Sequence, residues 1–500
     1  MYKIQELKTR LAEVYDLNAA AAVLGWDQAT YMPSGGAPAR GRQMATLASL
    51  AQQKFTDPAI GKLLDDLEKE TKNTPYDSDE AALVRKTRRD YNKQIKVPAA
   101  WVSKFSAHSA QAYQVWTVAR PANDFKSVQD NLKKTLDLSR EYANFFPGYD
   151  HIADPLIDGP DPGMKAADIR KVFGKLREQL VPIVKAITSQ PEADESPLHK
   201  GFPEDEQLEF GISVSKDYGL DMKRSRQDKT HHPFCTTFSI GDVRITTRVK
   251  ESDVSDALFS TLHETGHALY ELGVNPALEA TPLMGGTSSG VHESQSRTWE
   301  NLVGRSRGFW EHYYPKLQEK FPKQLKDVSL DAFYRAINKV QRSLIRTDAD
   351  EVTYNLHVMV RFELELQMLE GKLEIKDLPE AWNSRYQGDL GIHAPSDVDG
   401  VLQDVHWYGG LIGGAFQGYT LGNIISGLFY EAALKAHPEI PAEIGKGQFS
   451  TLHTWLKETL YWHGSKFTPN ELIERITGGQ LRIEPYISYL KTKYGELYKL

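Results

Sequence analysis

The stretch from His263 to His267 reads His-Glu-Thr-Gly-His and contains the residues best suited to chemistry. Two histidines four residues apart stand one turn from each other on the same face of a helix, so both imidazoles can reach a single Zn²⁺ ion. Glu264 follows the first histidine and can take a proton from a water molecule bound to that ion. The spacing therefore predicts a metal-dependent hydrolase, with peptides as the favoured substrates.

The surrounding residues predict the helix that this motif requires. Ser252 and Asp253 can cap its N-terminus, and Gly273 and Pro276 can end it. Apolar residues recur between these ends at helical spacing, namely Val254, Leu258, Leu262, Leu269 and Leu272. The alternative is a surface helix with two unrelated histidines, but a capped helix with an apolar face favours a metal site.

A third ligand must come from outside the motif, because a catalytic zinc ion usually has three protein ligands and one position open to water. A longer form of the motif would place histidine where Gly273 stands. The next candidates, His292 and Glu293, open a second predicted helix, where neighbouring side chains point about 100° apart. We favour Glu293 as the ligand. His292 then either forms a hydrogen bond to a ligand or simply packs.

Composition and charge exclude several classes of protein. The 500 residues include 60 Lys and Arg and 67 Asp and Glu, with a net charge of −7 and no basic tract. Neither nucleic acid nor an anionic membrane surface is favoured as a partner.

Residues 1–23 lack the apolar core of a signal peptide. The only cysteine, Cys235, excludes an intrachain disulfide and fits a cytoplasmic location. We expect it to be a small strand residue rather than a catalytic thiol.

Residues 407–430 contain no Lys, Arg, Asp or Glu and are long enough to cross a bilayer. They also contain seven glycines together with Gln417 and Asn423. The apolar content is too low for a membrane span. We therefore expect a buried, glycine-rich segment beside the active site, and no membrane partner.

Apolar residues at helical spacing predict a mainly α fold, with helices over residues 1–23, 40–72, 78–96, 99–119, 124–146, 166–188 and 204–218. The exception is a β-hairpin of residues 235–240 and 243–249 around Gly241-Asp242, shortly before the metal helix. A strand there could pair with an extended peptide, or the hairpin could be purely structural. The loop 189–206 would divide a single domain of residues 1–500 into sub-lobes of 1–190 and 205–500.

Six motifs occur in order between residues 232 and 407. They are His232-Pro233-Phe234, Asp242-Val243-Arg244-Ile245-Thr246, His263-Glu264-x-x-His267, His292-Glu293-Ser294-Gln295, Ile345-Arg346-x-x-Ala349-Asp350 and Gly400-x-x-Gln403-Asp404-x-His406-Trp407. In these motifs the chain resembles the carboxypeptidase Taq family of zinc metallocarboxypeptidases. Trp26-Asp27 and Met32-Pro33 extend the resemblance to essentially the whole chain. It implies a large, two-lobed helical fold with a deep substrate groove and a small sheet beside the metal helix, commonly as a homodimer.

The resemblance also implies an activity and a metal site. Members remove C-terminal residues one at a time from peptides with a free C-terminus, with broad specificity and poor action on proline. His263, His267 and Glu293 would bind zinc, for which cobalt could substitute. Glu264 would be the general base and then the proton donor.

Substrate-binding roles follow from the same motifs. Arg346, or as second choice Arg244, would bind the α-carboxylate through its bidentate guanidinium group. An ion pair with Asp350 or Asp242 is the structural alternative for these arginines. Further substrate-binding residues are His232 and Asp350, and the donors to the oxyanion are Tyr419 and His406. Tyr419 could equally be an ordinary buried tyrosine. The residues before it, 414–418, lack the aromatic-Pro element of many relatives, which predicts a more flexible loop.

Two alternatives to a carboxypeptidase stay open. An oligopeptidase or a dipeptidyl carboxypeptidase could use the same metal ligands. A zinc-stabilised protein that binds peptides without cutting them is of a different class. Glu264 argues against it, because a structural site needs no base and favours four protein ligands.

Overall fold

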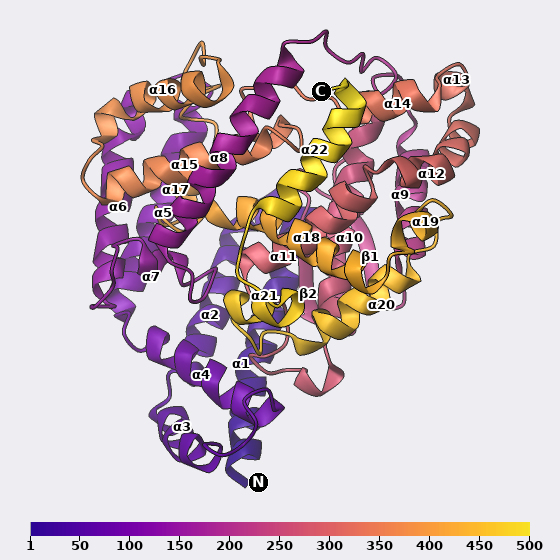
Figure 1. Cartoon of the computed structure of the whole chain (residues 1–500). Coiled ribbons are helices and arrows are strands. Elements are labelled where there is room, and N and C mark those ends of the chain that lie inside the picture. The colour runs from indigo at the N-terminus through magenta and orange to yellow at the C-terminus, as the bar shows by residue number, and fades with distance from the viewer. Residues whose placement is uncertain (1) are drawn as a thin grey trace.

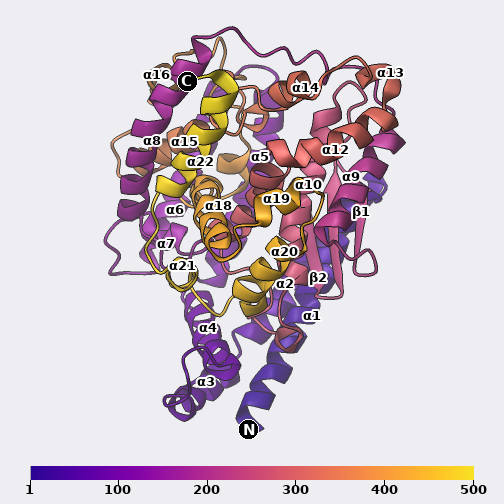
Figure 2. The same cartoon turned by 45° about the vertical axis from the view of Figure 1, so that its right-hand side comes forward.

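The computed structural model describes residues 2–500 and confirms a mainly α-helical fold with one small sheet (Figure 1). The N-terminal half contains α1 (Tyr2–Thr30), α2 (Ala37–Phe55), α3 (Pro58–Glu70), α4 (Asp79–Gln94), α5 (Ala99–Ala119), α6 (Gln129–Asn144), α7 (Asp154–Ile157), α8 (Ala166–Thr188) and α9 (Glu204–Tyr218). In both views the N-terminus, α3 and α4 lie at one end of the molecule, and the C-terminus lies at the other (Figure 1, Figure 2).

The prediction of one helix over residues 40–72 was wrong, because two helices, α2 and α3, occupy this stretch. Pro58 lacks the N–H group that would continue α2. The Asp57 carboxylate instead accepts a hydrogen bond from Ala59 N at 2.8 Å and caps the new helix. The first helix is longer than predicted and continues to Thr30.

The predicted hairpin is present, but it belongs to a three-stranded sheet in the order β1–β3–β2. Strands β2 (Cys235–Ser239) and β3 (Asp242–Thr247) pair antiparallel, and β1 (Ser225–Lys229) pairs parallel with β3. The sequence did not predict β1, because its residues Ser-Arg-Gln-Asp-Lys show no alternation of apolar side chains. Val243 and Ile245 of β3 are buried and pack with Ala268 and Leu272, which places the sheet beside the next helix.

The rest of the chain is again helical. It contains α10 (Val254–Leu272), α11 (Ser289–Arg297), α12 (Arg307–Lys320), α13 (Pro322–Leu325), α14 (Leu330–Ile337), α15 (Tyr354–Leu369), α16 (Leu378–Leu390), α17 (His406–Gly409), α18 (Gln417–Ala436), α19 (Ile440–Ile444), α20 (Ser450–Thr459), α21 (Pro469–Thr477) and α22 (Glu484–Tyr498). Directly after α11, the residues Thr298–Val303 form a π-helical segment.

The largest cluster of buried apolar side chains includes residues from Ala112 to Tyr498, and a second cluster joins α1, α3 and α4. The charge-free stretch 407–430 forms α17, a glycine-rich loop and most of α18, and it is largely buried. Within residues 2–500, the structure contains no helix with the length and apolar character needed to span a membrane.

The last helix is tied to the loop that precedes α15. Lys493 Nζ lies 2.7 Å from Glu351 Oε2, and the Tyr494 hydroxyl donates to the same oxygen at 2.8 Å. The side chains of Lys493 and Glu351 are only 6% and 2% exposed, so this ion pair lies inside the protein. Helix α22 therefore holds the segment that carries Arg346.

Candidate functional site

The helix predicted around the His-Glu-x-x-His motif is α10, and its ends are as expected. The Asp253 carboxylate caps it by accepting a hydrogen bond from Ser255 N, and Gly273 follows its last residue. The second predicted helix is α11, which Ser288 caps through Val291 N at 3.1 Å. These two helices carry the three expected metal ligands.

The side chains of His263, His267 and Glu293 converge, with one donor atom of each within 4.8 Å of the others. Glu293 Oε2 lies 3.7 Å from His263 Nε2 and 3.5 Å from His267 Nε2. Two ligands held about 2.1 Å from a zinc ion in tetrahedral geometry lie about 3.4 Å apart. The spacing and the chemistry of this donor set therefore fit such an ion.

Glycines allow the helices around Glu293 to approach closely. A Cβ atom on Gly266 of α10 would lie 2.5 Å from the Gln295 carbonyl oxygen and 2.6 Å from Ser296 Cα. A Cβ atom on Gly422 of α18 would lie 2.5 Å from Glu293 Cγ. Helix α11 is thus held between α10 and α18, and Glu293 has little room to move.

The substitution Gly266→Ala is expected to weaken metal binding. Its new methyl group would meet the backbone of α11, which can yield only if the whole helix shifts and takes Glu293 with it. Alanine favours a helix over glycine by about 1 kcal/mol, but overpacking costs about 1–3 kcal/mol. We expect a lower Tm and a larger metal dissociation constant, measured by competition with a chromophoric chelator.

The matched control is Gly174→Ala in α8, where a Cβ atom would meet no atom within 4 Å. It should raise Tm slightly and leave the metal dissociation constant unchanged. Unchanged metal affinity in Gly266→Ala would contradict the proposed role of the close approach.

Each of the two histidines expected to bind metal is oriented by a contact at its Nδ1 atom. His263 Nδ1 lies 2.9 Å from Glu300 Oε2, so it donates there and leaves Nε2 for an ion. His267 Nδ1 lies 2.6 Å from His292 Nδ1, and His292 Nε2 lies 2.7 Å from Glu271 Oε1. If His292 Nε2 donates to Glu271, then His292 Nδ1 accepts from His267, whose Nε2 is left for the ion. His292 thus forms a hydrogen bond to an expected ligand, His267, which is one of the two alternatives predicted for it.

Arg297 connects Glu293, the third expected ligand, to Glu300, which contacts His263. Its Nε donates to Glu293 Oε1 at 2.8 Å, and its Nη1 donates to Glu300 Oε2 at 3.2 Å. Oxygen Oε1 of Glu293 is therefore occupied, while Oε2 faces the two histidines. Burial opposes ionisation of Glu300, but the charge of Arg297 and the hydrogen bond from His263 outweigh it and lower the pKa of Glu300 to about 2.

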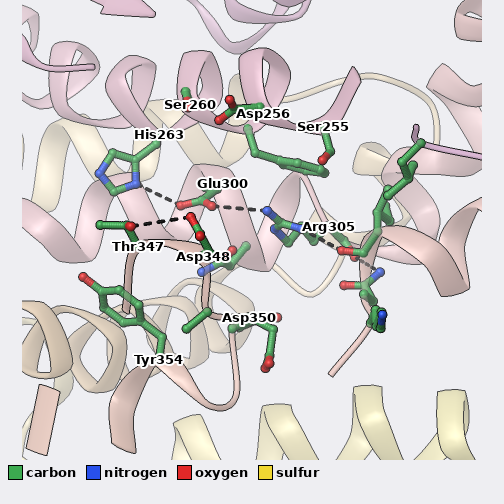
Figure 3. A pocket seen from close by; sticks show the side chains of 18 of the residues that line it. Ser255, Asp256, Ser260, His263, Glu300, Arg305, Thr347, Asp348, Asp350 and Tyr354 are labelled. Carbon is green, nitrogen blue, oxygen red and sulfur yellow. Dashed lines mark hydrogen bonds and ion pairs between the residues drawn. The ribbon is translucent and has the colours of Figure 1, made fainter. Parts of the chain in front are cut away.

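A cavity of about 560 Å³ opens beside the ligands and is lined by His263, Glu264 and Arg346, among others. Figure 3 shows His263 and Tyr354 on one side of the cavity, and Ser255 and Arg305 on the other. Burial raises the pKa of Glu264 to about 7. A carboxyl group with such a pKa can both accept and release a proton near neutral pH.

Arg346 reaches the cavity from the loop before α15. Its Nε and Nη2 atoms donate to Asp404 Oδ1 at 3.0 and 2.9 Å, and its Nη1 donates to the Tyr354 hydroxyl at 3.1 Å. Its ion pair is therefore with Asp404 rather than with Asp350. The ring of Tyr419 lies 5.4 Å from the centre of the guanidinium group.

Arg244 and Asp350 have structural contacts. Arg244 forms the ion pair with Asp242 that was its structural alternative, with two hydrogen bonds of 2.8 Å, and lies 4.4 Å above the ring of Trp26. The Asp350 carboxylate lines the cavity but accepts hydrogen bonds from the backbone before α15 and from the Thr353 hydroxyl. Arg346 is also paired, but it lines the cavity whereas Arg244 is not among the lining residues, and this favours Arg346 as the group that meets substrate.

Of the three further candidates, Tyr419 and His406 lie near Arg346, and His232 lies near His406. The Tyr419 hydroxyl is 3.4 Å from His406 Nε2, so α17 and the start of α18 bring these two side chains together. Burial raises the pKa of Tyr419 to about 12 and lowers that of His406 to about 4, so both are neutral near neutral pH. His232 lies on the exposed loop between β1 and β2 and is close enough to His406 to contribute to its lowered pKa. None of these three is among the residues that line the cavity of Figure 3.

Cys235 lies in β2, as expected. Burial raises the pKa of its thiol well above the usual value, with the nearby Glu264 and Glu271 contributing in the same direction. A protonated thiol is a poor nucleophile. This environment fits the structural interpretation of Cys235.

Comparison with protein families matches residues 6–494 to the carboxypeptidase Taq (M32) metallopeptidases. The chain belongs to this family. Among relatives of this Taq-family peptidase, thermostable carboxypeptidase 1 of Thermus thermophilus is 41% identical over 99% of this chain and 98% of its own length. Carboxypeptidase 1 of Bacillus subtilis is 35% identical over 99% and 100% of the two chains.

A solved structure agrees with this assignment. The crystal structure of the M32 carboxypeptidase from Deinococcus radiodurans R1 is 51% identical, has a TM-score of 0.98 and covers 100% of both chains. Because the Taq family is a family of metallopeptidases, the chain is a metallopeptidase, and a metal ion is the expected occupant of the His-His-Glu cluster.

Sequence reasoning missed three residues that hold the expected ligands of this Taq-family site in place, namely Glu271, Arg297 and Glu300. A usable signal existed for two of them, because positions 293, 297 and 300 share one face of a regular helix. The helix changes to a π-helical segment at Thr298, however, and a wider turn alters where Glu300 points. Its contact with His263 could not be predicted from spacing alone.

Glu365 of α15 is a buried acid beside the glycine-rich segment of this Taq-family peptidase. Its Oε1 accepts a hydrogen bond from Trp407 Nε1 at 2.9 Å, and burial raises its pKa from 4.5 to about 8. Between these two values the folded state keeps a proton that the unfolded state loses. The contribution of Glu365 to the free energy of unfolding is therefore fully present below the unfolded-state pKa of 4.5. It falls by at most about 1.4 kcal/mol per pH unit as the pH rises toward the folded-state pKa of about 8.

The substitution Glu365→Gln is expected to remove this contribution, because glutamine stays neutral at every pH. The free energy of unfolding, measured by denaturant titration near the two ends of that range, should differ less between them in the variant than in the wild-type protein. The exposed Glu380→Gln serves as the control and should keep the wild-type difference. The same difference in Glu365→Gln would contradict the assignment.

Proposed function

We propose that this protein is a zinc-dependent carboxypeptidase that hydrolyses the C-terminal peptide bond and releases single amino acids with broad specificity. The observation that carries the proposal is the His263–His267–Glu293 cluster, which adjoins a cavity lined by both Glu264 and Arg346. Three protein ligands leave a position for water, and a guanidinium group suits a carboxylate. Relatives from T. thermophilus and B. subtilis are named carboxypeptidases.

The chain's own residues divide the work of hydrolysis. A zinc ion, when bound, polarises the scissile carbonyl group and lowers the pKa of a water molecule. Glu264 accepts the proton of the attacking water and delivers it to the nitrogen of the departing amino acid. Arg346 holds the C-terminal carboxylate and so fixes the position of the last peptide bond.

The remaining candidate residues would stabilise the oxyanion or help to bind the substrate. Tyr419 or His406 donates a hydrogen bond to the oxyanion of the tetrahedral intermediate. The raised pKa of Tyr419 keeps its proton available for this bond. His232 and Asp350 complete the proposed substrate-binding set, while the ion pair of Arg244 with Asp242 supports a structural role there.

We further propose zinc as the metal in use, with cobalt as a substitute, because two imidazoles and a carboxylate suit such ions. We also propose that residues 1–500 form one domain, that the protein is a cytoplasmic homodimer, and that peptides are its partners. The second cluster of buried side chains, which joins α1, α3 and α4 to Ile240, Val274 and Leu278, supports a single domain. The single cysteine supports a reducing compartment, and sedimentation would test the dimer.

Mass spectrometry of peptide digests tests the proposed activity. The zinc-loaded protein would be incubated with a peptide that has a free C-terminus and, separately, with its C-terminal amide. We expect loss of one residue at a time from the free peptide only. Internal cuts or equal cutting of the amide would indicate an endopeptidase, loss of two residues at a time a dipeptidyl carboxypeptidase, and no cutting a binding protein.

A further inference from the structure

Asp404 lies between two arginine side chains. Arg346 donates to its Oδ1 atom at 3.0 and 2.9 Å, and Arg361 of α15 donates to its Oδ2 atom. The Asp404 side chain is 6% exposed and that of Arg361 is 0% exposed. Each carboxylate oxygen therefore has an arginine of its own, and the three groups form a buried row.

This row has one positive charge in excess. Burial opposes ionisation of Asp404, but the charges of Arg361 and Arg346 outweigh it and hold its pKa well below the usual value. Three acid–base groups lie nearby. Burial lowers the pKa of His406 to about 4, lowers that of His357 well below its usual value and raises that of Glu365 to about 8, so all three are neutral near neutral pH. Two arginines and one carboxylate then sum to +1.

The other contacts of Arg361 exclude a direct part in binding substrate. Its Nη1 donates to the His357 carbonyl oxygen at 2.7 Å and to the Tyr386 hydroxyl at 3.2 Å. Its Nη2 donates to Gln403 Oε1 at 2.6 Å, and the same oxygen accepts from Arg346 N at 2.9 Å. Arg346 lines the cavity, whereas Arg361 is not among the lining residues.

A lone Arg346–Asp404 pair would be neutral, and the Asp404 carboxylate would repel the incoming carboxylate of a substrate. Arg361 cancels the charge of Asp404 from the buried side. We infer that Arg361 is a positioning residue that acts through Asp404 and leaves Arg346 free to bind the C-terminal carboxylate of the substrate. When substrate is bound, two arginines and two carboxylates alternate and their charges cancel. The inference rests on the proposed role of Arg346.

Stability alone gives little reason for such a row. Replacing a buried ion pair with apolar residues of similar volume is often neutral or stabilising. Two arginines on one buried aspartate are more readily explained by a function that needs the excess charge. We therefore expect Arg361 to affect the binding of substrate, and a variant that removes both Arg361 and the charge of Asp404 separates this effect from the cost of leaving a buried charge unpaired.

The decisive experiment compares Arg361→Met with the double variant Arg361→Met/Asp404→Asn. The single variant brings the charge of the row to zero, and we expect KM for a peptide with a free C-terminus to rise by about 30-fold or more, with a smaller change in kcat. The double variant restores +1, and KM should return to within about threefold of the wild-type value. Arg385→Met in α16 is the matched control and should leave KM unchanged.

Binding to the metal-free protein gives a second measurement that does not depend on catalysis. Calorimetry would compare an acetylated dipeptide with its C-terminal amide. The wild-type protein should prefer the free acid, and Arg361→Met should lose this preference. Arg361→Lys keeps the charge, so it should keep the preference, and it decides the question if Arg361→Met does not fold.

The outcomes separate the inference from the function on which it rests. A wild-type protein without preference for the free acid would overturn the proposed role of Arg346. A wild-type preference that persists in Arg361→Met, or a double variant no better than the single one, would overturn only the inference about Arg361. Loss of the preference for the free acid in Arg361→Lys would also overturn the inference about Arg361. It would show that a positive charge at this position is not enough to support carboxylate binding by Arg346.

Discussion

The variant Glu264→Gln should fold and bind one metal ion, yet its kcat should be about 10³-fold lower than that of the wild-type protein. Glutamine has nearly the same shape as glutamate, so the buried surroundings of α10 can accommodate it. It cannot accept the proton of water or pass it to the leaving nitrogen. Because His263, His267 and Glu293 are unchanged, the metal content should stay the same.

Two measurements check this expectation together, namely kcat on a peptide with a free C-terminus and metal content by atomic absorption. The control Glu311→Gln changes an exposed glutamate on α12 and should affect neither. A Glu264→Gln protein with near-full activity would contradict the proposed mechanism. A protein that loses its metal as well would show that Glu264 contributes to the ion site instead.

The variant Arg346→Ala should lower kcat/KM for peptides with a free C-terminus by about 100-fold or more, because truncating a buried charged partner typically costs about 2–5 kcal/mol. Cleavage of amidated peptides, which we expect to be slow in the wild-type protein, should change far less. The fold is expected to survive, since Asp404 keeps its ion pair with Arg361. Metal content should be unchanged.

Steady-state kinetics on the acid and amide forms of one peptide provide the test. Arg385→Ala serves as the control for removing an arginine. Arg244→Ala examines the other candidate, whose guanidinium group is already paired with Asp242. If Arg244→Ala rather than Arg346→Ala caused the large loss, the carboxylate-binding role would move to Arg244.

Sequence reasoning predicted the parts of the site that depend on local spacing. The histidines of α10 and the capped start of α11 follow from rules that operate within one or two helical turns. Glu293 could be proposed because only a few donors follow the motif. The ordered motifs also drew attention to Arg346, although its partner proved to be Asp404 rather than Asp350.

The features that escaped prediction depend on contacts between distant segments. Strand β1 has a polar sequence and is a strand because β3 lies beside it. Glu300 supports His263 only because the chain changes to a π-helical segment after α11. Arg361 lies in the middle of a helix without a recognisable motif, and only the fold shows that it shares Asp404 with Arg346.

Two contacts made by late segments of the chain, that of Gly422 with Glu293 and that of Lys493 with Glu351, bear on when the site can form during translation. When translation has reached residue 293, all three proposed metal ligands have been made. Helix α18, which confines one of them, and α22, which holds the loop carrying Arg346, are still to be synthesised. A chain terminated between these points would therefore contain all three proposed metal ligands but not the helices that hold the site in place. We expect such a chain not to hydrolyse the peptides around it.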